Sequence, residues 1–260
     1  MGQALEAAQY SEATMPQPPS LSGTRLRWAW VPSACHVCGV WPAQPQGQAI
    51  CGACLDAFAP TVPRCPTCAQ VLGTADTCGE CLGRPLTLAQ CVAAVDYSYP
   101  WDQPIARFKF HGDTAWAHLF TDLMSRAPGA HELLTRCHSF VPLPLTPRRL
   151  GERGYNQAGL MAQALARQAS GHRRKPRFDW LVKLQDTPAQ HELDRPARLL
   201  NLRTAFAVSP HALPGLQGQR VLLIDDIMTT GATLHAAAQA LTMAGAAEVN
   251  ALVFARTPRA

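Results

Sequence analysis

The sequence predicts an α/β protein, a parallel sheet with helices on both faces, preceded by a small cysteine-rich domain. Two observations support this prediction. Eight of the ten cysteines lie within one 47-residue segment, and after Pro85 strand-like apolar runs alternate with helix-like stretches. The chain has 260 residues, of which 47% are hydrophobic and 16% charged, so it can bury a sizeable core and lacks the composition of a disordered protein.

The cysteine-rich segment consists of Cys-x-x-Cys pairs. Two thiolates separated by two residues can reach one ion from a tight turn, and two such turns complete a tetrahedral sulfur site suited to Zn²⁺. Eight thiols therefore predict two zinc ions. Each site has four protein ligands and no place for a water molecule, so the metal is expected to be structural. The four pairs are Cys35/Cys38, Cys51/Cys54, Cys65/Cys68 and Cys78/Cys81.

Sequential pairing is the expected arrangement of these thiols, because the intervals inside each set suit a small hairpin. The first ion would be held by Cys35, Cys38, Cys51 and Cys54, and the second by Cys65, Cys68, Cys78 and Cys81. Spacing alone also permits an interleaved pairing. Disulfides are the other alternative, which a reducing cytoplasm disfavours. Cys91 and Cys137 stand alone in apolar surroundings, which is typical of buried small residues.

The rest of the chain alternates predicted strands and helices. The strands are expected over Cys91–Tyr97, Ser139–Leu143, Trp180–Leu184, Arg220–Ile224 and Glu248–Ala255. The helices are expected over Asp113–Arg126 with an acidic N-cap, Tyr155–Gln168, His191–Leu202 and Thr233–Ala244. This order predicts a parallel sheet, whose ligands bind beyond the carboxyl ends of the strands. We divide the chain into a flexible extension (1–34), the cysteine-rich domain (35–85) and the α/β domain (86–260).

Two adjacent acids, Asp225 and Asp226, follow the buried strand Arg220–Ile224. Burying two carboxylates is costly unless hydroxyl groups or a metal ion bind them. The next turn offers hydroxyl donors, a glycine with an accessible N–H and the positive end of a helix dipole, which together suit a phosphate monoester. Its residues are Thr229, Thr230, Gly231, Ala232 and Thr233. An ordinary strand-to-helix loop with Thr as N-cap is the alternative.

The segment Ile224–Thr233 resembles the signature of the type I phosphoribosyltransferases, which bind phosphoribosyl pyrophosphate (PRPP). The resemblance implies that Asp225 and Asp226 hold the ribose hydroxyls and that residues 229–233 bind the 5′-phosphate. The preceding four cysteine pairs extend the match to the ComF family, over Cys35–Arg256. Further matching blocks are Phe108–Asp113, Val141–Pro144, Arg153–Gln157 and Gln190–Leu193, followed by Arg198, Asn201 and Phe206.

Membership of that family would imply a Rossmann-like type I phosphoribosyltransferase domain after a double zinc ribbon. The ligands implied are PRPP and Mg²⁺, and the role implied is DNA uptake during transformation or use of external DNA. Arg198 and Asn201 would belong to the hood over the acceptor site. His191 and Glu192 resemble a general base only weakly, since such a pair is typical of a polar surface, and no base is assigned.

Pyrophosphate carries several negative charges, so its release needs cations to neutralise them. The candidates are Lys109, Arg148, Arg149 and Arg153. Arg148 and Arg149 are expected in a Pro-flanked loop after the strand that ends near Leu143, at the carboxyl edge of the sheet. A solvated basic loop is the alternative. Asn156 is a further ligand candidate, with capping of the following helix as its alternative.

Charge and hydropathy set the remaining expectations. The net charge of +5 permits a phosphate-bearing partner without requiring one. The longest stretch without charged residues, Trp28–Leu55, is interrupted by prolines and glutamines, so no membrane insertion is expected. Residues 1–20 contain Glu6 and Glu12 and no apolar run, which is unlike a secretory signal and favours the cytoplasm.

Two functions from different classes fit these observations. The first is a transferase that displaces pyrophosphate from PRPP toward an unidentified acceptor. The second is a non-catalytic zinc-ribbon adaptor that binds single-stranded DNA or proteins of the competence machinery. Acids held in bridges with neighbouring guanidinium groups would contradict the sugar site on which the first depends.

Overall fold

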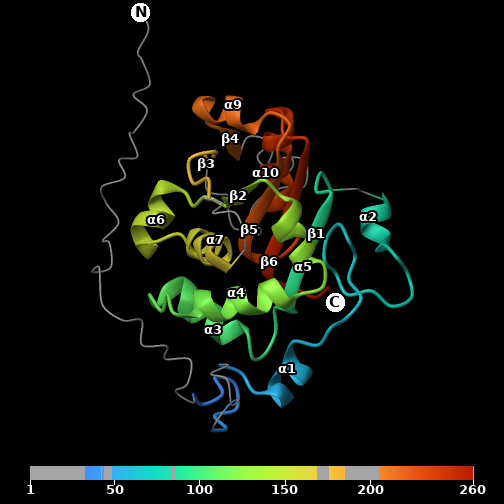
Figure 1. The fold of residues 1–260 in the computed structure, drawn as a ribbon, viewed down its shortest axis with the longest axis vertical. Helices are drawn as coiled ribbons and strands as arrows, with labels where there is room; N and C mark the ends of the chain where they lie inside the picture. The colour runs from blue at the N-terminus through green and yellow to red at the C-terminus, as the bar shows by residue number, and fades with distance from the viewer. Residues whose placement is uncertain are drawn as a thin grey trace, which may run out of the picture.

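The fold is that of a computed structural model, drawn in Figure 1. The structure describes residues 33–41, 43, 49–83, 86–168, 176–184 and 205–259. The predicted helix His191–Leu202 lies outside the described residues, and with it the candidates Arg198 and Asn201.

A four-stranded parallel sheet forms the centre of the molecule, in the order β1-β6-β5-β2. Its strands are β1 (Gln90–Asp96), β2 (Ser139–Pro142), β5 (Arg220–Met228) and β6 (Glu248–Arg256). The predicted α/β fold with a parallel sheet is confirmed. The strand predicted to end at Ile224 is longer, because its pairing with β6 continues to Met228. Asp225 and Asp226 therefore lie within β5, and as neighbours in a strand they face opposite sides of the sheet.

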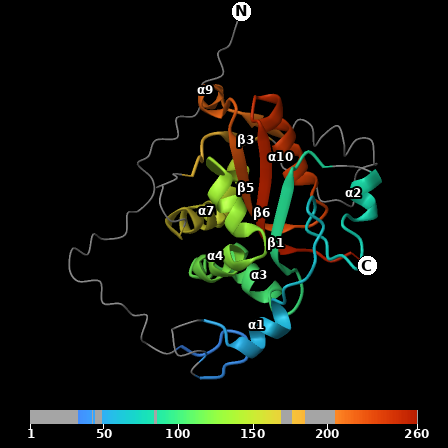
Figure 2. The same ribbon diagram turned by 45° about the vertical axis from the view of Figure 1, so that its right-hand side comes forward.

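Helices cover both faces of this sheet, as Figure 2 shows. One face carries α4 (Trp116–Arg126), α5 (Ala130–Arg136) and α7 (Gln157–Gln168), with α3 (Asp102–Phe110) against α4. The other face carries α10 (Ala232–Met243). In α4 the buried residues Ala117, Phe120 and Met124 recur at helical spacing, so one stripe of this helix faces the core.

Two local details predicted for this side of the sheet were wrong. The helix predicted over Asp113–Arg126 forms as α4, but it begins at Trp116 and lacks the acidic cap. The Asp113 carboxylate instead accepts a hydrogen bond from Trp116 Nε1 at 2.9 Å. Arg148 and Arg149 lie in a helix, α6 (Pro147–Arg153), and not in a loop. Here Pro147 occupies the first turn, and the Thr146 hydroxyl accepts from the N–H of Arg149.

The strand predicted over Trp180–Leu184 forms, but outside the central sheet. It is β3 (Leu181–Lys183), which pairs antiparallel with β4 (Phe206–Val208) in a separate two-stranded sheet. The remaining short elements are α1 (Gly52–Phe58), α2 (Gly79–Gly83), the 3₁₀ helix η3 (Pro210–Ala212) and α9 (Leu213–Leu216). No helix among the described residues is long and apolar enough to cross a membrane.

The two halves of the cysteine-rich segment pack on different cores. In Figure 1 α1 lies beneath α3, whereas the chain from 60 to 83 lies beside β1. The first half joins the core under α3, α4 and α7, and Trp101 Nε1 donates to the carbonyl of Phe58 at 2.7 Å. The second half joins the core on the α10 side, and Arg64 forms an ion pair with Asp96 of β1 at 2.8 Å.

Candidate functional site

The eight cysteines of the pairs form two groups, each with four sulfur atoms within 4.8 Å of one another. The first group is Cys35, Cys38, Cys51 and Cys54, and the second is Cys65, Cys68, Cys78 and Cys81. Within the described residues the thiols thus gather sequentially, as expected, and not in the interleaved arrangement. Four converging sulfur atoms are the donor set of a structural zinc site, so both groups fit a double zinc ribbon.

The two groups are built on the same backbone turn. The N–H of Gly39 donates to the carbonyl of Cys35, and the N–H of Ala69 donates to that of Cys65. Gly39 and Ala69 follow the second cysteine of their pairs and both have positive φ, 74° and 57°. Burial raises the pKa of the Cys35 thiol, but backbone N–H groups directed at its sulfur outweigh this effect and lower the pKa to about 6. The pKa of Cys65 is likewise lowered to about 7, whereas burial raises the pKa of Cys54, Cys68 and Cys81. The first cysteine of each group is therefore the one that most readily becomes a thiolate, the form that binds zinc.

The two acids of β5 lie in different surroundings. Asp226 is only 6% exposed, and its carboxylate forms an ion pair with Nζ of Lys109 at 3.0 Å. Asp225 is partly exposed on the other face, and its Oδ1 accepts from the N–H of Asp226 at 2.9 Å. Among the described residues no guanidinium group pairs with either acid, so the arrangement that would contradict a sugar site is absent there.

The carboxyl group of Asp225 changes its charge near neutral pH. Burial, and then the neighbouring charge of Asp226, raise its pKa from 3.8 to about 7, against the opposing charges of Lys109 and Lys183. A carboxyl group with this pKa gains most from a partner that stabilises its ionised form, such as a diol or a cation.

The turn after β5 leads into the N-terminus of α10. Gly231 is the N-cap of α10 with φ 84°, in the left-handed region, and a Cβ at this position would collide with the Met228 side chain. Thr229 and Thr230 are exposed, and the Thr230 hydroxyl accepts from the N–H of Ala232 at 3.3 Å. The turn therefore presents hydroxyl groups at the positive end of a twelve-residue helix.

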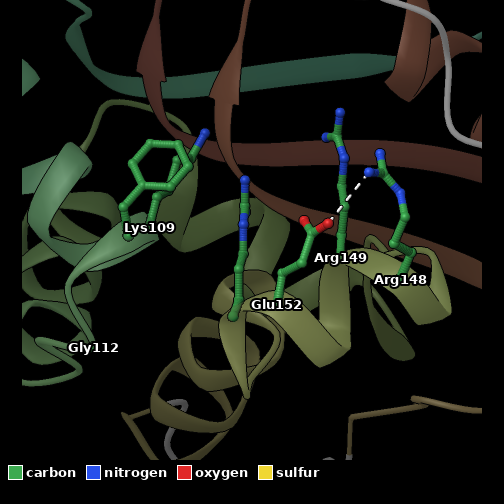
Figure 3. Close-up of a pocket in the computed structure, with 7 residues that line it drawn as sticks. Lys109, Gly112, Arg148, Arg149 and Glu152 are labelled. Atoms are coloured by element: carbon green, nitrogen blue, oxygen red, sulfur yellow. Dashed lines mark hydrogen bonds and ion pairs between the residues drawn. The ribbon is translucent and has the colours of Figure 1, made fainter.

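A basic cavity of about 490 Å³ is lined by Lys109, the ion-pair partner of Asp226. Its lining residues come from α3, α6 and the turn after α3, and they are Lys109, Phe110, Gly112, Arg148, Arg149, Glu152 and Arg153. Figure 3 shows Lys109, Arg148 and Arg149 extending in a common direction, with Arg148 bound to Glu152. Residues 229–233 do not line the cavity. Lys109 lines it and also pairs with Asp226, so this side chain connects the cavity with the acids and the turn that follows them.

Asn156 has a structural role in this region. Its Nδ2 donates to the carbonyl of Leu143 at 3.0 Å, and its Oδ1 accepts from the N–H of Gly159 at 3.1 Å, which caps α7. Both ends of the amide are occupied, which favours the capping alternative over ligand contact. Arg153 lies at the cavity, donating to Gln157 Oε1 at 3.0 Å.

Comparison with known proteins identifies the family. Residues 152–260 match the phosphoribosyl transferase domain. The DNA utilization protein YhgH of Salmonella typhi is 32% identical over 236 residues, which cover 87% of this chain and 98% of that protein. Competence protein F of Haemophilus influenzae is 33% identical over 202 residues, covering 75% of this chain and 85% of that protein. The chain belongs to the ComF family.

A third ComF relative, the competence protein ComFC of Bacillus subtilis, is 31% identical over 205 residues, covering 74% of this chain and 78% of the relative. The domain match contains β5, the turn 229–233 and α10, but begins after Lys109 and Arg148. The site described above thus combines residues within the matched domain with residues that precede it.

Two charged residues of this ComF protein lie near the site but were not among the candidates predicted from the sequence. Lys183 of β3 is 8% exposed, and its charge lowers the pKa of Asp225. Arg256, at the end of β6, is fully buried beside the turn that follows β5. Neither stands in a recognisable motif. Pairing of β5 with β6 places Arg256 opposite Met228, and Lys183 lies in the separate sheet of β3 and β4.

Proposed function

We propose that this ComF protein binds PRPP with Mg²⁺ at the carboxyl edge of its sheet and serves in the uptake or use of DNA. The observation that carries the proposal is the succession of Asp225 and Asp226, the left-handed Gly231 and the N-terminus of α10. The names of the relatives refer to DNA utilization and competence.

Each part of PRPP has a complementary group in the site. The 5′-phosphate would accept hydrogen bonds from Thr229, Thr230 and Thr233 and from N–H groups at the start of α10. The carboxylates of Asp225 and Asp226 would accept from the ribose 2′- and 3′-hydroxyls. The pyrophosphate would enter the basic cavity lined by Lys109, Arg148, Arg149 and Arg153. Bound Mg²⁺ would supply further neutralisation of the pyrophosphate charge, and carboxylate oxygens are ligands it prefers.

Lys109 would change partner when PRPP binds. In the structure its ammonium group holds Asp226, and the same side chain lines the basic cavity. Binding of the ribose hydroxyls would release Lys109 toward the pyrophosphate. The ion pair thus compensates both charges before the ligand arrives, at the cost of an exchange during binding.

Turnover would consist of displacement at the ribose C1. The bond from C1 to the pyrophosphate oxygen breaks, pyrophosphate leaves with the electron pair, and the acceptor forms the new bond to C1. An acceptor that carries a proton on the attacking atom loses it to solvent, since we assign no general base. Positioning and charge neutralisation are then the contributions of the protein.

Calorimetric titration with PRPP and Mg²⁺ tests the proposed ligand. Wild-type protein is expected to bind, and the double variant Asp225→Asn/Asp226→Asn is expected to lose at least about 100-fold in affinity, because charge-assisted hydrogen bonds to the sugar disappear. Asp122→Asn is the matched control, since Asp122 is an exposed acid paired with Arg126 on α4. Equal binding by wild type and the double variant would rule out the assignment of the acids.

A second candidate, an adaptor for single-stranded DNA, is favoured by one observation. Phe110 is 68% exposed beside the basic cavity, with the Arg153 guanidinium 5.2 Å from its ring centre. Exposed aromatic rings next to cations suit stacked bases and a phosphate backbone. Pyrophosphate release should be measured with nucleobases, amines and single-stranded DNA as acceptors. No release with any of them, together with salt-sensitive DNA binding, would favour the adaptor.

We place the domain boundary at residue 85 and assign ligand contacts to Arg153 and Arg198, whereas Asn156, a ligand candidate from the sequence, is assigned to capping of α7. Arg198 is assigned to the acceptor side by family resemblance alone. An Arg198→Gln variant is expected to bind PRPP like wild type but to lose transfer to the acceptor.

A further inference from the structure

Arg256 is a fully buried arginine whose guanidinium group joins two distant parts of the chain. Its Nε donates to the carbonyl of Cys68, in the second cysteine group, at 2.8 Å. Its Nη1 donates to the carbonyl of Met228 at 3.0 Å, and also to that of Thr229. A direct polar connection therefore leads from the second cysteine group to the residues that begin the phosphate turn.

The positive charge of Arg256 also indicates an interaction with the second cysteine group. Within the part of the chain that the structure describes, no carboxylate pairs with this guanidinium, although a buried unpaired cation is strongly destabilising. A Zn²⁺ ion held by four thiolates has a net charge of about −2. Cys65 and Cys68 are as deeply buried as Arg256, so a zinc tetrathiolate at this group would supply the missing negative charge.

A second connection runs in parallel. The chain leaving the second cysteine group passes the start of α10, where the N–H of Thr87 donates to Nδ1 of His235 at 2.9 Å. A Cβ on Gly231 would lie 3.5 Å from the Leu86 side chain. The first cysteine group packs on the opposite core, and no hydrogen bond among the described residues joins it to residues 228–233.

We propose that Arg256 is a positioning residue that couples zinc occupancy of the second cysteine group to the conformation of residues 228–233, and so to the binding of a phosphorylated ligand. The inference rests on the zinc and phosphate roles proposed above. Such coupling is reciprocal: zinc at the second site orders the turn, and a phosphate ligand on the turn slows zinc loss from the second site but not from the first.

Hydrogen–deuterium exchange tests the coupling without any ligand. Cys78→Ser, which removes a ligand of the second site, is expected to raise exchange in peptides covering residues 228–233 at least about tenfold. Cys38→Ser, which removes a ligand of the first site, is the control and is expected to leave these peptides unchanged. An equal increase in exchange of residues 228–233 in both variants, or no increase in Cys78→Ser, would overturn the proposal.

The substitution Arg256→Lys tests whether the positive charge at this position is enough or whether the hydrogen bonds of the guanidinium group are needed. Lysine keeps the positive charge but cannot span carbonyls of both segments as the guanidinium fork does. We expect two zinc per chain by elemental analysis, faster exchange in residues 228–233, and about tenfold weaker PRPP binding. Arg64→Lys is the matched control, because Arg64 also donates to the second cysteine group, at the Ala69 carbonyl, but pairs with Asp96 and not with the turn. Equal effects of both substitutions would contradict the specific role of Arg256.

Zinc transfer to a coloured chelator measures the reciprocal effect in the wild-type protein, so it does not depend on a variant that folds. Two kinetic phases are expected, and saturating PRPP with Mg²⁺ should slow only one of them, the phase that Cys38→Ser retains. Equal slowing of both phases, or of neither while calorimetry shows PRPP bound, would refute the coupling. Absence of PRPP binding in calorimetry would instead refute the proposed function, and the exchange experiment would still decide the role of Arg256.

Discussion

Asp225 and Asp226 are adjacent in the sequence, yet their positions in the sheet give them opposite effects on the stability of the ligand-free protein. Asp226 compensates the charge of Lys109, whereas no comparable ion pair of Asp225 is found among the described residues. Burial and the charge of Asp226 raise the pKa of Asp225 to about 7. Ionised Asp225 therefore destabilises the ligand-free protein, as is common for residues kept for binding.

Substitution of each acid by asparagine should change stability in opposite directions. Because folding raises the pKa of Asp225 from 3.8 to about 7, the penalty is small at pH 4, grows as the pH rises to 7 and is constant above that. Asp225→Asn is thus expected to gain at least about 1 kcal/mol, or roughly 2–4 °C in Tm, at pH 8 and little at pH 4. Asp226→Asn should lose about 1–3 kcal/mol at pH 8, because the ammonium group of Lys109 loses its partner. Thermal unfolding monitored by circular dichroism at both pH values checks the signs, and destabilisation of Asp225→Asn at pH 8 would contradict the reasoning.

Gly231 offers a second test at the scale of one residue. An alanine there would have a φ near +84°, which costs about 1–2 kcal/mol, and its Cβ would displace the Met228 side chain. Gly231→Ala is expected to weaken PRPP binding at least about tenfold in calorimetry. Gly218→Ala is the control, since Gly218 also has a positive φ, 67°, but lies before β5 with open space around it. It should lose similar stability and keep full affinity; a similar loss of affinity in both would mean that strain alone is responsible.

At the scale of elements, α6 determines where the basic cavity lies. The helix begins at Pro147 with Thr146 as its cap and ends at the left-handed Gly154, so both ends are fixed by local chemistry. Its residues Arg148, Arg149 and Arg153 all line the cavity. A short helix holds these side chains in a defined direction, which a solvated loop would not.

Removal of the cap tests this role of α6. Thr146→Ala deletes the hydroxyl that accepts from Arg149 N–H and is expected to cost about 1 kcal/mol, or ~3 °C in Tm. PRPP affinity should fall several-fold as α6 frays, while Thr146→Ser should restore both values. Calorimetry and thermal unfolding provide the measurements. A loss of affinity that serine does not restore would show that the cap is not the cause.

At the scale of the whole molecule, the cysteine groups belong to the architecture of the α/β domain. Cys35, Cys51 and Cys54 are part of the core beneath α3, α4 and α7, whereas Cys65, Cys68 and Cys81 are part of the core on the α10 side. Each cysteine group thus belongs to one of the two cores on either side of the sheet, and a zinc ion bound there would close that core. Loss of metal is therefore expected to destabilise the whole domain.

Zinc removal is therefore expected to lower the Tm of the whole protein by at least about 10 °C in one cooperative transition. Elemental analysis of the purified protein should give two zinc per chain. Scanning calorimetry before and after chelation, with zinc added back as the control, provides the measurement. A value near one zinc per chain would contradict the ligand assignment, and an unchanged main transition would contradict the integration of the ribbons with the cores.

Features formed by residues that are neighbours in the chain could be predicted from the sequence. The cysteine pairs are short local turns, and the acids, Gly231 and the start of α10 lie within the eight residues 225–232. Burial on one face or both also leaves a local pattern, so β1, β2, β6, α7 and α10 were predicted close to their observed bounds. Short helices such as α5 and α6 were missed because a few residues carry too little periodicity.

Contacts between residues far apart in the chain became visible in the three-dimensional fold. The pairing of Lys109 with Asp226, the approach of Lys183 to Asp225 and the placement of Arg256 against Cys68 all join segments far apart in the chain. The end of β5 also depends on β6, since a strand continues for as long as its neighbour supplies hydrogen bonds. Such contacts are fixed by sheet register and by the packing of helices on it, which no local pattern contains, because the free energy of burial belongs to pairs of surfaces and not to single segments.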